Sequence, residues 1–394
     1  MACRTGRDSG RCLRRFSAVR RTSARRPCVS VNEGRAFALD PIPGCEYWTA
    51  VIPVKQGRLH LFKFGLDGDW APGGDVAGYT SLSYELEGAA RGTLSDARSF
   101  VSKIYPGAVT TYWVYANHGI DTRRGAPVMV WHEGGDLVSR DPFALRMQVV
   151  TDNLVHLGLI PPMVHVLVSP SQPGDDRLPS RFEGEDQENA MRSLQYDTVS
   201  AVYAGFLVEE VLPDVERDFK LRSDAYSRAS AGASSGGICA FTVAWFRPDR
   251  FSRAHAAIGS FTGLQWANET GDGGFMLSNL IRQEKKRNIR VWLSSGSNDL
   301  DVPRTGRNDL YVAGSWPLNN LQLANALKHS GYDFHFRFGD GYHSPAQAAL
   351  DLPDSLAWLW RDYDPDRTDQ IFEQDCDERR LPPFRVQVAN RPSH

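Results

Sequence analysis

The sequence predicts an α/β protein, with a mostly parallel sheet covered by helices on both faces and a small β-rich segment in front of it. From residue 99 onward, short apolar strand patterns alternate with longer helical patterns, which is typical of a parallel sheet with helical crossovers. Residues 47–68 contain two strand patterns separated by a turn at 56–57. Serine, aspartate and histidine side chains follow three later strand patterns, at the edge where open α/β sheets bind ligands.

The composition is that of a soluble globular protein. The 394 residues suffice for one large domain or two, and the hydrophobic share of 41% and the charged share of 23% are ordinary. No apolar run reaches the roughly 18 residues of a membrane-spanning helix, so we expect no membrane partner. Residues 1–30 hold nine arginines and one acid, which leaves 36 basic and 46 acidic side chains in the remainder. An acidic body repels nucleic-acid phosphates, so we expect no nucleic-acid partner either.

The chain divides into four segments on composition and pattern. We expect an Arg-rich disordered head over 1–37, a β-rich segment over 38–98, an α/β domain over 99–366 and a C-terminal tail over 367–394. The head lacks the apolar core of a secretory signal, and an organelle transit peptide, a basic tail or a start codon placed too early would each explain it. A cytoplasmic location is the expectation that follows.

The individual elements follow from periodicity. One weak strand is expected at 81–86, within an otherwise irregular, Gly-rich stretch. The strands of the main sheet are expected at 110–115, 127–132, 163–168, 227–231, 253–258, 290–294 and 334–338. Helices are expected at 143–157, 199–219, 237–246, 318–330 and 346–362.

A nucleophilic serine is indicated by the G-x-S-x-G pattern of residues 232–236, which lies between a strand pattern and a helix pattern. Glycines at both flanks give the clearance that a sharp strand-to-helix turn needs, and they favour Ser234 as the nucleophile. Ser235 stays open as an alternative, because the pattern Ala233-x-Ser235-x-Gly237 is also sterically possible.

An acid and a base follow the serine in the order Ser…Asp…His, which is that of α/β hydrolases. His343 lies in a turn-rich loop after the last strand and is the candidate general base. Asp299 is the first acid past the strand at 290–294, and Asp301 is the alternative. Backbone N–H groups of Ser235 and of Gly134 or Gly135, in the turn after the strand at 127–132, are candidate oxyanion donors.

Metal and dinucleotide chemistry are not expected. His132 and Glu133 are adjacent, but no HExxH pattern extends them, and the six cysteines are scattered without metal spacing. No GxGxxG occurs, and the GDGG at 271–274 follows no strand. We therefore expect no cofactor and a small-molecule substrate. Arg192 is a candidate for gripping an anionic part of that substrate, or for a surface ion pair with Asp197, and Gly134 is a second candidate for substrate contact.

The chain resembles the putative-esterase family of α/β hydrolases, which includes ferric enterochelin esterases, esterase D and feruloyl esterases, from about residue 99 to 363. It is most similar to the enterochelin-esterase-like branch. The motifs that carry the resemblance are SKIYPG (102–107), YWVY (112–115), GASSGGICAFTVAWFRPDRFSR (232–253), IGSFTG (258–263), SGSNDLD (295–301), WPLNN (316–320) and GDGYHS (339–344).

The resemblance implies a serine esterase without metal or organic cofactor, with Ser234 as nucleophile, Asp299 as acid and His343 as base. Residues 47–68 look like part of the carbohydrate-module-like β-sandwich of enterochelin esterases, here shortened at its start. Residues 264–274 look longer and more polar than the family pattern, so substrate specificity is not carried over. An acyltransferase on the same triad and a non-catalytic carbohydrate-binding protein remain the alternatives.

Overall fold

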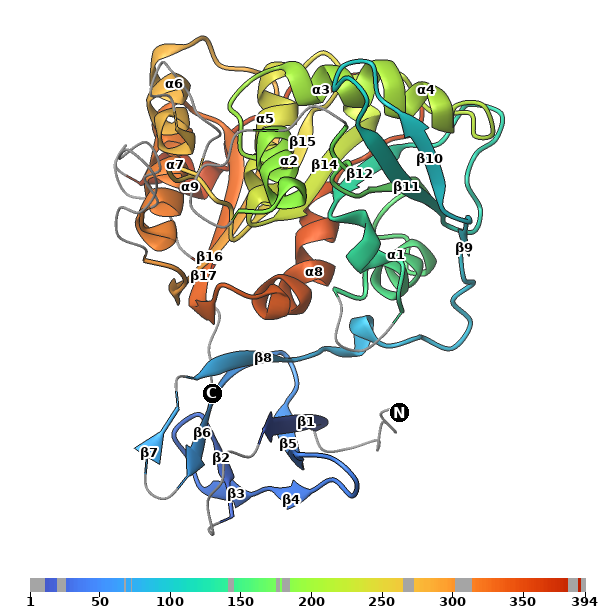
Figure 1. Cartoon of the computed structure of the whole chain (residues 1–394). Helices are drawn as coiled ribbons and strands as arrows, with labels where there is room; N and C mark the ends of the chain where they lie inside the picture. Colours follow the sequence, from blue (N-terminus) through green and yellow to red (C-terminus); the bar gives the residue numbers. More distant parts are fainter. Residues whose placement is uncertain are drawn as a thin grey trace.

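The computed structural model describes residues 11–19, 26–66, 69–71, 73–140, 145–174, 178, 185–264, 273–301, 314–381 and 389–390. Figure 1 shows two parts, a small N-terminal β-module and a larger α/β domain. Over these residues, none of the helices combines the length and the apolar character needed to cross a bilayer.

The α/β domain is built on a ten-stranded sheet in the order β10-β11-β13-β12-β14-β15-β16-β17-β18, with β9 beside β11. Strands β12 to β17 run parallel, and β9, β10 and β11 form an antiparallel edge. The strands are β9 (Thr93–Leu94), β10 (Arg98–Val101), β11 (Val109–Ala116), β12 (Val128–His132), β13 (Val164–Val168), β14 (Arg228–Ala233), β15 (Arg253–Ala257), β16 (Arg290–Asn298), β17 (Asp333–Tyr342) and β18 (Ala389–Asn390).

Helices cover both faces of this sheet, which confirms the predicted fold class (Figure 1). One face packs on α1 (Met147–His156) and α8 (Pro345–Leu359), through residues such as Leu154 and Leu356. The other face packs on α2 (Gln187–Tyr196), α3 (Val202–Phe206), α4 (Leu212–Val215), α5 (Ser235–Phe246), α6 (Leu277–Gln283) and α7 (Trp316–His329). The last helix is α9 (Cys376–Arg380). Strands β12 to β16 are buried on both faces at their centres, as parallel strands between helix layers are.

The seven strands expected in the main sheet are all present, and one local expectation is wrong. The helix expected over 199–219 is present over 202–215, with a π-helical turn at Leu207–Val211 next to Pro213, whose ring nitrogen cannot donate to a helical carbonyl. The weak strand expected at 81–86 is instead a 3₁₀ turn at Ser81–Ser83. Helices α2 and α6 were not expected from periodicity. The long segment at 264–274 lies mostly outside the described residues.

The β-module begins earlier in the chain than the sequence suggests. Its two antiparallel sheets have the orders β1-β5-β4 and β3-β2-β6-β7, with β8 paired to β6. The strands are β1 (Arg11–Val19), β2 (Cys28–Val31), β3 (Ala36–Ala38), β4 (Asp40–Pro41), β5 (Tyr47–Lys55), β6 (Arg58–Leu66), β7 (Asp69–Trp70) and β8 (Gly74–Gly78). Strands β1 and β2 therefore lie inside the segment expected to be an unfolded head. Phe16 and Val29 are buried against Ile52 in the module core, while Arg15 and Ser17 point outward.

The module packs against α8 of the larger domain. Leu59 of β6 and Ala77 of β8 form one buried cluster with Ala349 and Leu350 of α8. Figure 1 shows β8 running directly beneath α8 and the end of β17. The two parts therefore share a hydrophobic contact, which lies on the helix that follows the histidine loop.

Stability is expected to fall as the solution becomes acidic, because several histidines are buried. Burial lowers the pKa of His132 and His165 to about 3, and that of His255 and His335 to about 4. An unfolded histidine has a pKa near 6.5, so between these values the unfolded chain binds more protons than the folded chain. The free energy of unfolding should therefore decline as the pH falls from about 6.5 to 4.

Urea unfolding at several pH values between 7 and 4 measures this decline. His335→Phe is the matched variant, since phenylalanine can keep the ring stack on Trp292 but does not titrate. Its stability should depend less steeply on pH than that of the parent chain. Equal slopes for the two proteins would contradict the assignment to buried histidines.

Candidate active site

Ser234 occupies a sharp turn between β14 and α5. Its backbone has φ 58° and ψ −124°, a strained conformation for a residue with a side chain. A Cβ at Gly232 would come within 2.4 Å of the Gly236 carbonyl oxygen, so only glycine allows the chain to turn this tightly. The Ser234 amide donates to the Ala257 carbonyl at 3.0 Å, which ties the turn to the end of β15. The turn raises the serine side chain above the carboxyl edge of the sheet, as the G-x-S-x-G pattern predicts.

The structure brings Ser234, His343 and Asp299 into one hydrogen-bonded chain. Ser234 Oγ lies 2.8 Å from His343 Nε2, and His343 Nδ1 lies 2.6 Å from Asp299 Oδ1. Ser234 follows β14, Asp299 follows β16 and His343 follows β17, so the three lie within a span of four adjacent parallel strands, with β15 between β14 and β16. Because an ionised carboxylate can only accept, Nδ1 carries the imidazole proton and Nε2 is left as the acceptor for the serine hydroxyl.

Asp299 is fixed by further hydrogen bonds and is shielded from water. Its side chain is 0% exposed. The Leu300 amide donates to Asp299 Oδ1 at 2.7 Å, and Ser295 Oγ donates to Oδ2 at 3.3 Å. Asp301, the alternative acid, is exposed and forms a backbone bridge with Ser315 instead. The geometry therefore favours Asp299 over Asp301.

Two residues that the sequence analysis gave no role support the serine and the histidine. Trp316 lies edge-on to the His343 ring, with 5.5 Å between ring centroids, and its Nε1 donates to Ser260 Oγ at 3.1 Å. Ser260 Oγ in turn lies 3.3 Å from Ser234 Oγ. Both lie within motifs, WPLNN and IGSFTG, that carry the family resemblance, but neither motif has a spacing that reveals its chemistry.

The candidate oxyanion donors lie at the start of α5 and in the turn after β12. The first amides of a helix have no partner within it, so the N–H of Ser235 is available to an anion beside Ser234. A Cβ at Gly236 would lie 3.1 Å from the His132 Cβ, which shows how closely the β12 turn approaches this helix start. In that turn, Gly134 is buried against Leu167, and the Gly135 amide donates to Ser169 Oγ at 3.0 Å.

Arg192 of α2 lies beside the serine turn. Its Nη1 donates to Ser235 Oγ at 3.1 Å, and its Nε donates to Glu133 Oε1 at 2.5 Å. The ion pair is thus with Glu133, whereas Asp197 accepts from Ser193 Oγ. Burial raises the pKa of Glu133 and Arg192 opposes that rise, so the pair is coupled. Both side chains keep about a third of their surface exposed, 27% for Glu133 and 30% for Arg192, and remain accessible beside Ser234.

Glu133 itself stands in the left-handed region, with φ 60°. This conformation turns the chain from β12 into the short helix at Gly134–Leu137 and aims the Glu133 side chain at Arg192. The sequence did not reveal this pairing, since nothing in the spacing of residues 133 and 192 relates them.

The side chains of His132 and Glu133 are both engaged by protein partners. His132 is buried, its Nε2 contacts Ser230 Oγ at 3.0 Å and its Nδ1 contacts the Tyr203 hydroxyl at 3.3 Å. Within the described residues, the group of potential ligands whose atoms lie near one another is Asp375, Cys376 and Asp377, all exposed at the start of α9. An exposed acidic cluster of this kind is no metal site by itself.

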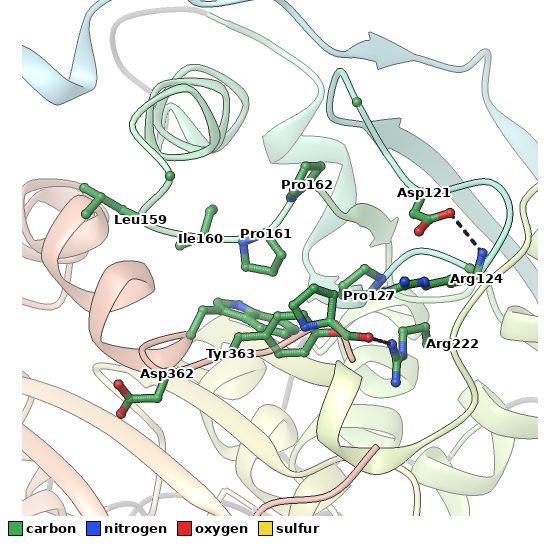
Figure 2. A pocket seen from close by; sticks show the side chains of 15 residues that line it. Asp121, Arg124, Pro127, Leu159, Ile160, Pro161, Pro162, Arg222, Asp362 and Tyr363 are labelled. Atoms are coloured by element: carbon green, nitrogen blue, oxygen red, sulfur yellow. Dashed lines mark hydrogen bonds between the residues drawn. The ribbon is translucent and has the colours of Figure 1, made fainter. Parts of the chain in front are cut away.

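A cavity of about 410 Å³ lies away from this chemistry, at the amino ends of the strands (Figure 2). Pro127 and Pro162, which precede β12 and β13, line it together with Arg222 and Tyr363. Arg222 is engaged by the Pro365 carbonyl, by the Arg367 carbonyl and by Asp224. The lining contains no serine, cysteine or histidine, so the cavity offers no hydroxyl–imidazole or thiol–imidazole pair like that of Ser234 and His343.

Comparison with known proteins identifies a family for most of the α/β domain. The model of the family described as "Putative esterase" matches residues 110–359. None of the curated protein sequences matches the chain.

Several solved structures share the fold. The enterobactin esterase from Shigella flexneri, determined in the presence of enterobactin, is 14% identical with a TM-score of 0.58, over 91% of this chain and 95% of that one. The ferric enterobactin esterase from Salmonella typhimurium is 15% identical with a TM-score of 0.56, over 89% and 94%. The covered fractions of this chain, 91% and 89%, exceed the length of the α/β domain. Part of the β-module is therefore aligned as well.

A ferulic acid esterase from Anaeromyces mucronatus, in complex with ferulic acid, is 16% identical with a TM-score of 0.52. The match covers 71% of this chain and 94% of that one. At these identities the structural likeness establishes the fold of the chain and leaves its substrate open.

Proposed function

The chain belongs to the putative esterase family, whose members hydrolyse carboxylic esters, and we propose that it does so through an acyl-enzyme formed on Ser234. The observation that carries this proposal is the pair of contacts at 2.8 and 2.6 Å that link Ser234, His343 and Asp299. Such a chain activates a hydroxyl that is otherwise a weak nucleophile.

In the first half-reaction, Ser234 Oγ attacks the ester carbonyl carbon while His343 Nε2 takes the hydroxyl proton. The imidazolium that forms is stabilised by Asp299, which keeps its negative charge. The tetrahedral intermediate collapses by breaking the bond to the alcohol oxygen, and His343 returns its proton to that oxygen. The products of this step are a free alcohol and an ester between the acyl group and Ser234.

In the second half-reaction, water takes the place of the alcohol. His343 Nε2 removes a proton from the water as its oxygen attacks the acyl carbon, and then returns the proton to Ser234 Oγ. The carboxylic acid leaves and the free serine is restored. The ester and the water, together with the residues of this chain, balance both steps.

The oxyanion of both intermediates is held by backbone amides in this proposal. The Ser235 amide is supported by its place at the helix start, beside the attacking oxygen. The Gly134–Gly135 turn is proposed to supply the second donor, with the Gly135 amide exchanging Ser169 Oγ for the oxyanion. Each such donor contributes roughly 2.7–4 kcal/mol to transition-state stabilisation.

Hydrolysis and acyl transfer are separated by product analysis. With p-nitrophenyl acetate and an added alcohol or sugar, we expect acetate as the main product, because the proposed deacylation uses water. Accumulation of the acceptor ester in place of acetate would assign the site to acyl transfer instead.

We further propose that Arg192 binds a polar or anionic part of the substrate. Its contact with Ser235 Oγ places the guanidinium beside the nucleophile, and two of its five N–H donors account for the contacts with Glu133 and Ser235. We propose that Gly134, which follows Glu133 in the chain, contributes a backbone contact to the same substrate group.

Arg192→Gln is expected to raise the KM of a carboxylate-bearing ester about 10-fold and that of p-nitrophenyl acetate much less, since a charge-assisted hydrogen bond is worth about 1.5–3 kcal/mol. Steady-state kinetics on both esters measure the difference. Arg217→Gln is the matched control, because Arg217 is 78% exposed and pairs with Asp214 on α4. Equal changes in KM for the two esters would contradict a role in charge recognition.

A further inference from the structure

The loop that carries His343 is hydrogen-bonded to the β-module. Asp75 lies in β8, and its Oδ2 accepts from the Tyr342 amide at 2.8 Å. Its Oδ1 accepts from Ser344 Oγ. One carboxylate from the N-terminal module therefore contacts the residues on both sides of His343 and does not touch the imidazole in between.

The Gly341 backbone lies close to both Gln347 and Asp75. A Cβ at Gly341 would lie 2.6 Å from Gln347 Oε1 and 3.3 Å from Asp75 Oδ2. Burial raises the pKa of Asp75, and the nearby Asp299 adds to that rise, while the hydrogen bonds from Ser344 and Tyr342 oppose it. A half-buried carboxylate so near another acid costs free energy, and its two donors offset that cost.

The same loop is anchored from its C-terminal side. Ser344 is the N-cap of α8, and its Oγ also accepts from the Ala346 amide at 3.2 Å. About one and a half turns further along, Ala349 and Leu350 pack on Leu59 and Ala77 of the module. Ser344 Oγ thus donates to the module and accepts from the helix, so the position of His343 depends on both.

We propose that Asp75 is a positioning residue that holds the His343 loop in reach of Ser234, which makes the β-module part of the catalytic unit. This inference rests on the proposed role of His343 as the general base. Asp75 acts through the backbone of residue 342 and the side chain of residue 344 and does not touch the reacting atoms. Its loss should therefore lower kcat and leave KM nearly unchanged.

The size of the effect follows from the geometry of proton transfer. A shift of about 1 Å in a catalytic group costs on the order of 10²-fold in rate. Asp75→Ala removes both acceptors and should lower kcat for p-nitrophenyl acetate by about 10- to 100-fold. Asp75→Asn should stay within about 3-fold of the parent, because its Oδ1 can accept from Tyr342 while its Nδ2 donates to the Ser344 hydroxyl.

The experiment compares these two variants with the parent and with Asp69→Ala, which alters an exposed acid of the same module at the start of β7. The readouts are kcat, KM, the rate of Ser234 labelling by a fluorophosphonate, and the free energy of unfolding in urea. We expect Asp75→Ala to lose kcat and labelling rate together, at unchanged KM, and Asp75→Asn to retain both. Asp69→Ala should match the parent.

Two outcomes overturn the inference while leaving the proposed function intact: full kcat in Asp75→Ala, or equal losses in the alanine and asparagine variants. An inactive parent chain would instead overturn the proposed function, and the inference with it. Should Asp75→Ala not fold, Asp75→Ser takes its place, since its hydroxyl is too short to reach both donors. The same fall in kcat at unchanged KM is then expected, and full activity would again overturn the inference.

Discussion

Replacing Ser234 with alanine is expected to lower kcat for ester hydrolysis by about 10⁴-fold or more and to abolish labelling by a fluorophosphonate. In the proposed mechanism the hydroxyl oxygen forms the acyl-enzyme, and its loss leaves His343 with no serine hydroxyl to activate. The residual rate should be the slow reaction that the oxyanion donors alone support. Steady-state hydrolysis of p-nitrophenyl acetate and gel detection of the probe measure the two effects.

The control for this variant is Ser235→Ala. That change keeps the Ser235 amide and removes only the hydroxyl that Arg192 contacts, so most of the activity should remain. Urea unfolding should show both variants folded, because neither change adds volume. A fully active Ser234→Ala protein would exclude the proposed mechanism. If, in addition, Ser235→Ala were inactive, the nucleophile would be assigned to Ser235 instead.

Replacing Asp299 with asparagine is expected to lower kcat by about 10³- to 10⁴-fold with little change in KM. The Asp299 carboxylate accepts from His343 Nδ1–H and thereby keeps Nε2 free of a proton. An asparagine amide can present its N–H₂ to Nδ1 instead, which favours the tautomer protonated at Nε2. That tautomer cannot take the proton from Ser234.

Asp301→Asn is the matched control, since Asp301 is exposed, carries the same charge and lies two residues further along the same loop. It should retain activity close to that of the parent chain. The pH dependence of kcat/KM for both variants distinguishes loss of His343 as the general base from loss of one negative charge near the site. If Asp301→Asn were the impaired variant and Asp299→Asn the active one, the acid would be wrongly assigned.

The residues of the proposed catalytic chain could be located from the sequence because each of them follows a strand. Parallel strands end at one edge, so Ser234, Asp299 and His343 meet there although they are far apart in the chain. The glycines around Ser234 added a steric reason for choosing that serine. The strands of the main sheet could also be predicted, because they are short apolar runs bounded by polar turns.

The remaining contacts depend on how separate elements meet, which periodicity does not encode. The pairing of Arg192 with Glu133 needs α2 to cross the end of β12, and the contact of Asp75 with the His343 loop needs the module to dock on α8. Strands β1 and β2 were missed because the arginine content of residues 1–30 outweighed the alternation that buries Phe16. Composition describes the average of a segment, and burial is decided residue by residue.

The measurement that tests the central claim most directly is the identification of the residue that a fluorophosphonate modifies in the wild-type chain. The labelled protein is digested, and tandem mass spectrometry locates the added phosphonyl group within the peptide that contains residues 232–246. The proposal predicts modification of Ser234, and loss of the label after preincubation with an ester that acylates the same oxygen. A label on Ser235, on a serine elsewhere, or on none would contradict the assignment of Ser234 as the nucleophile.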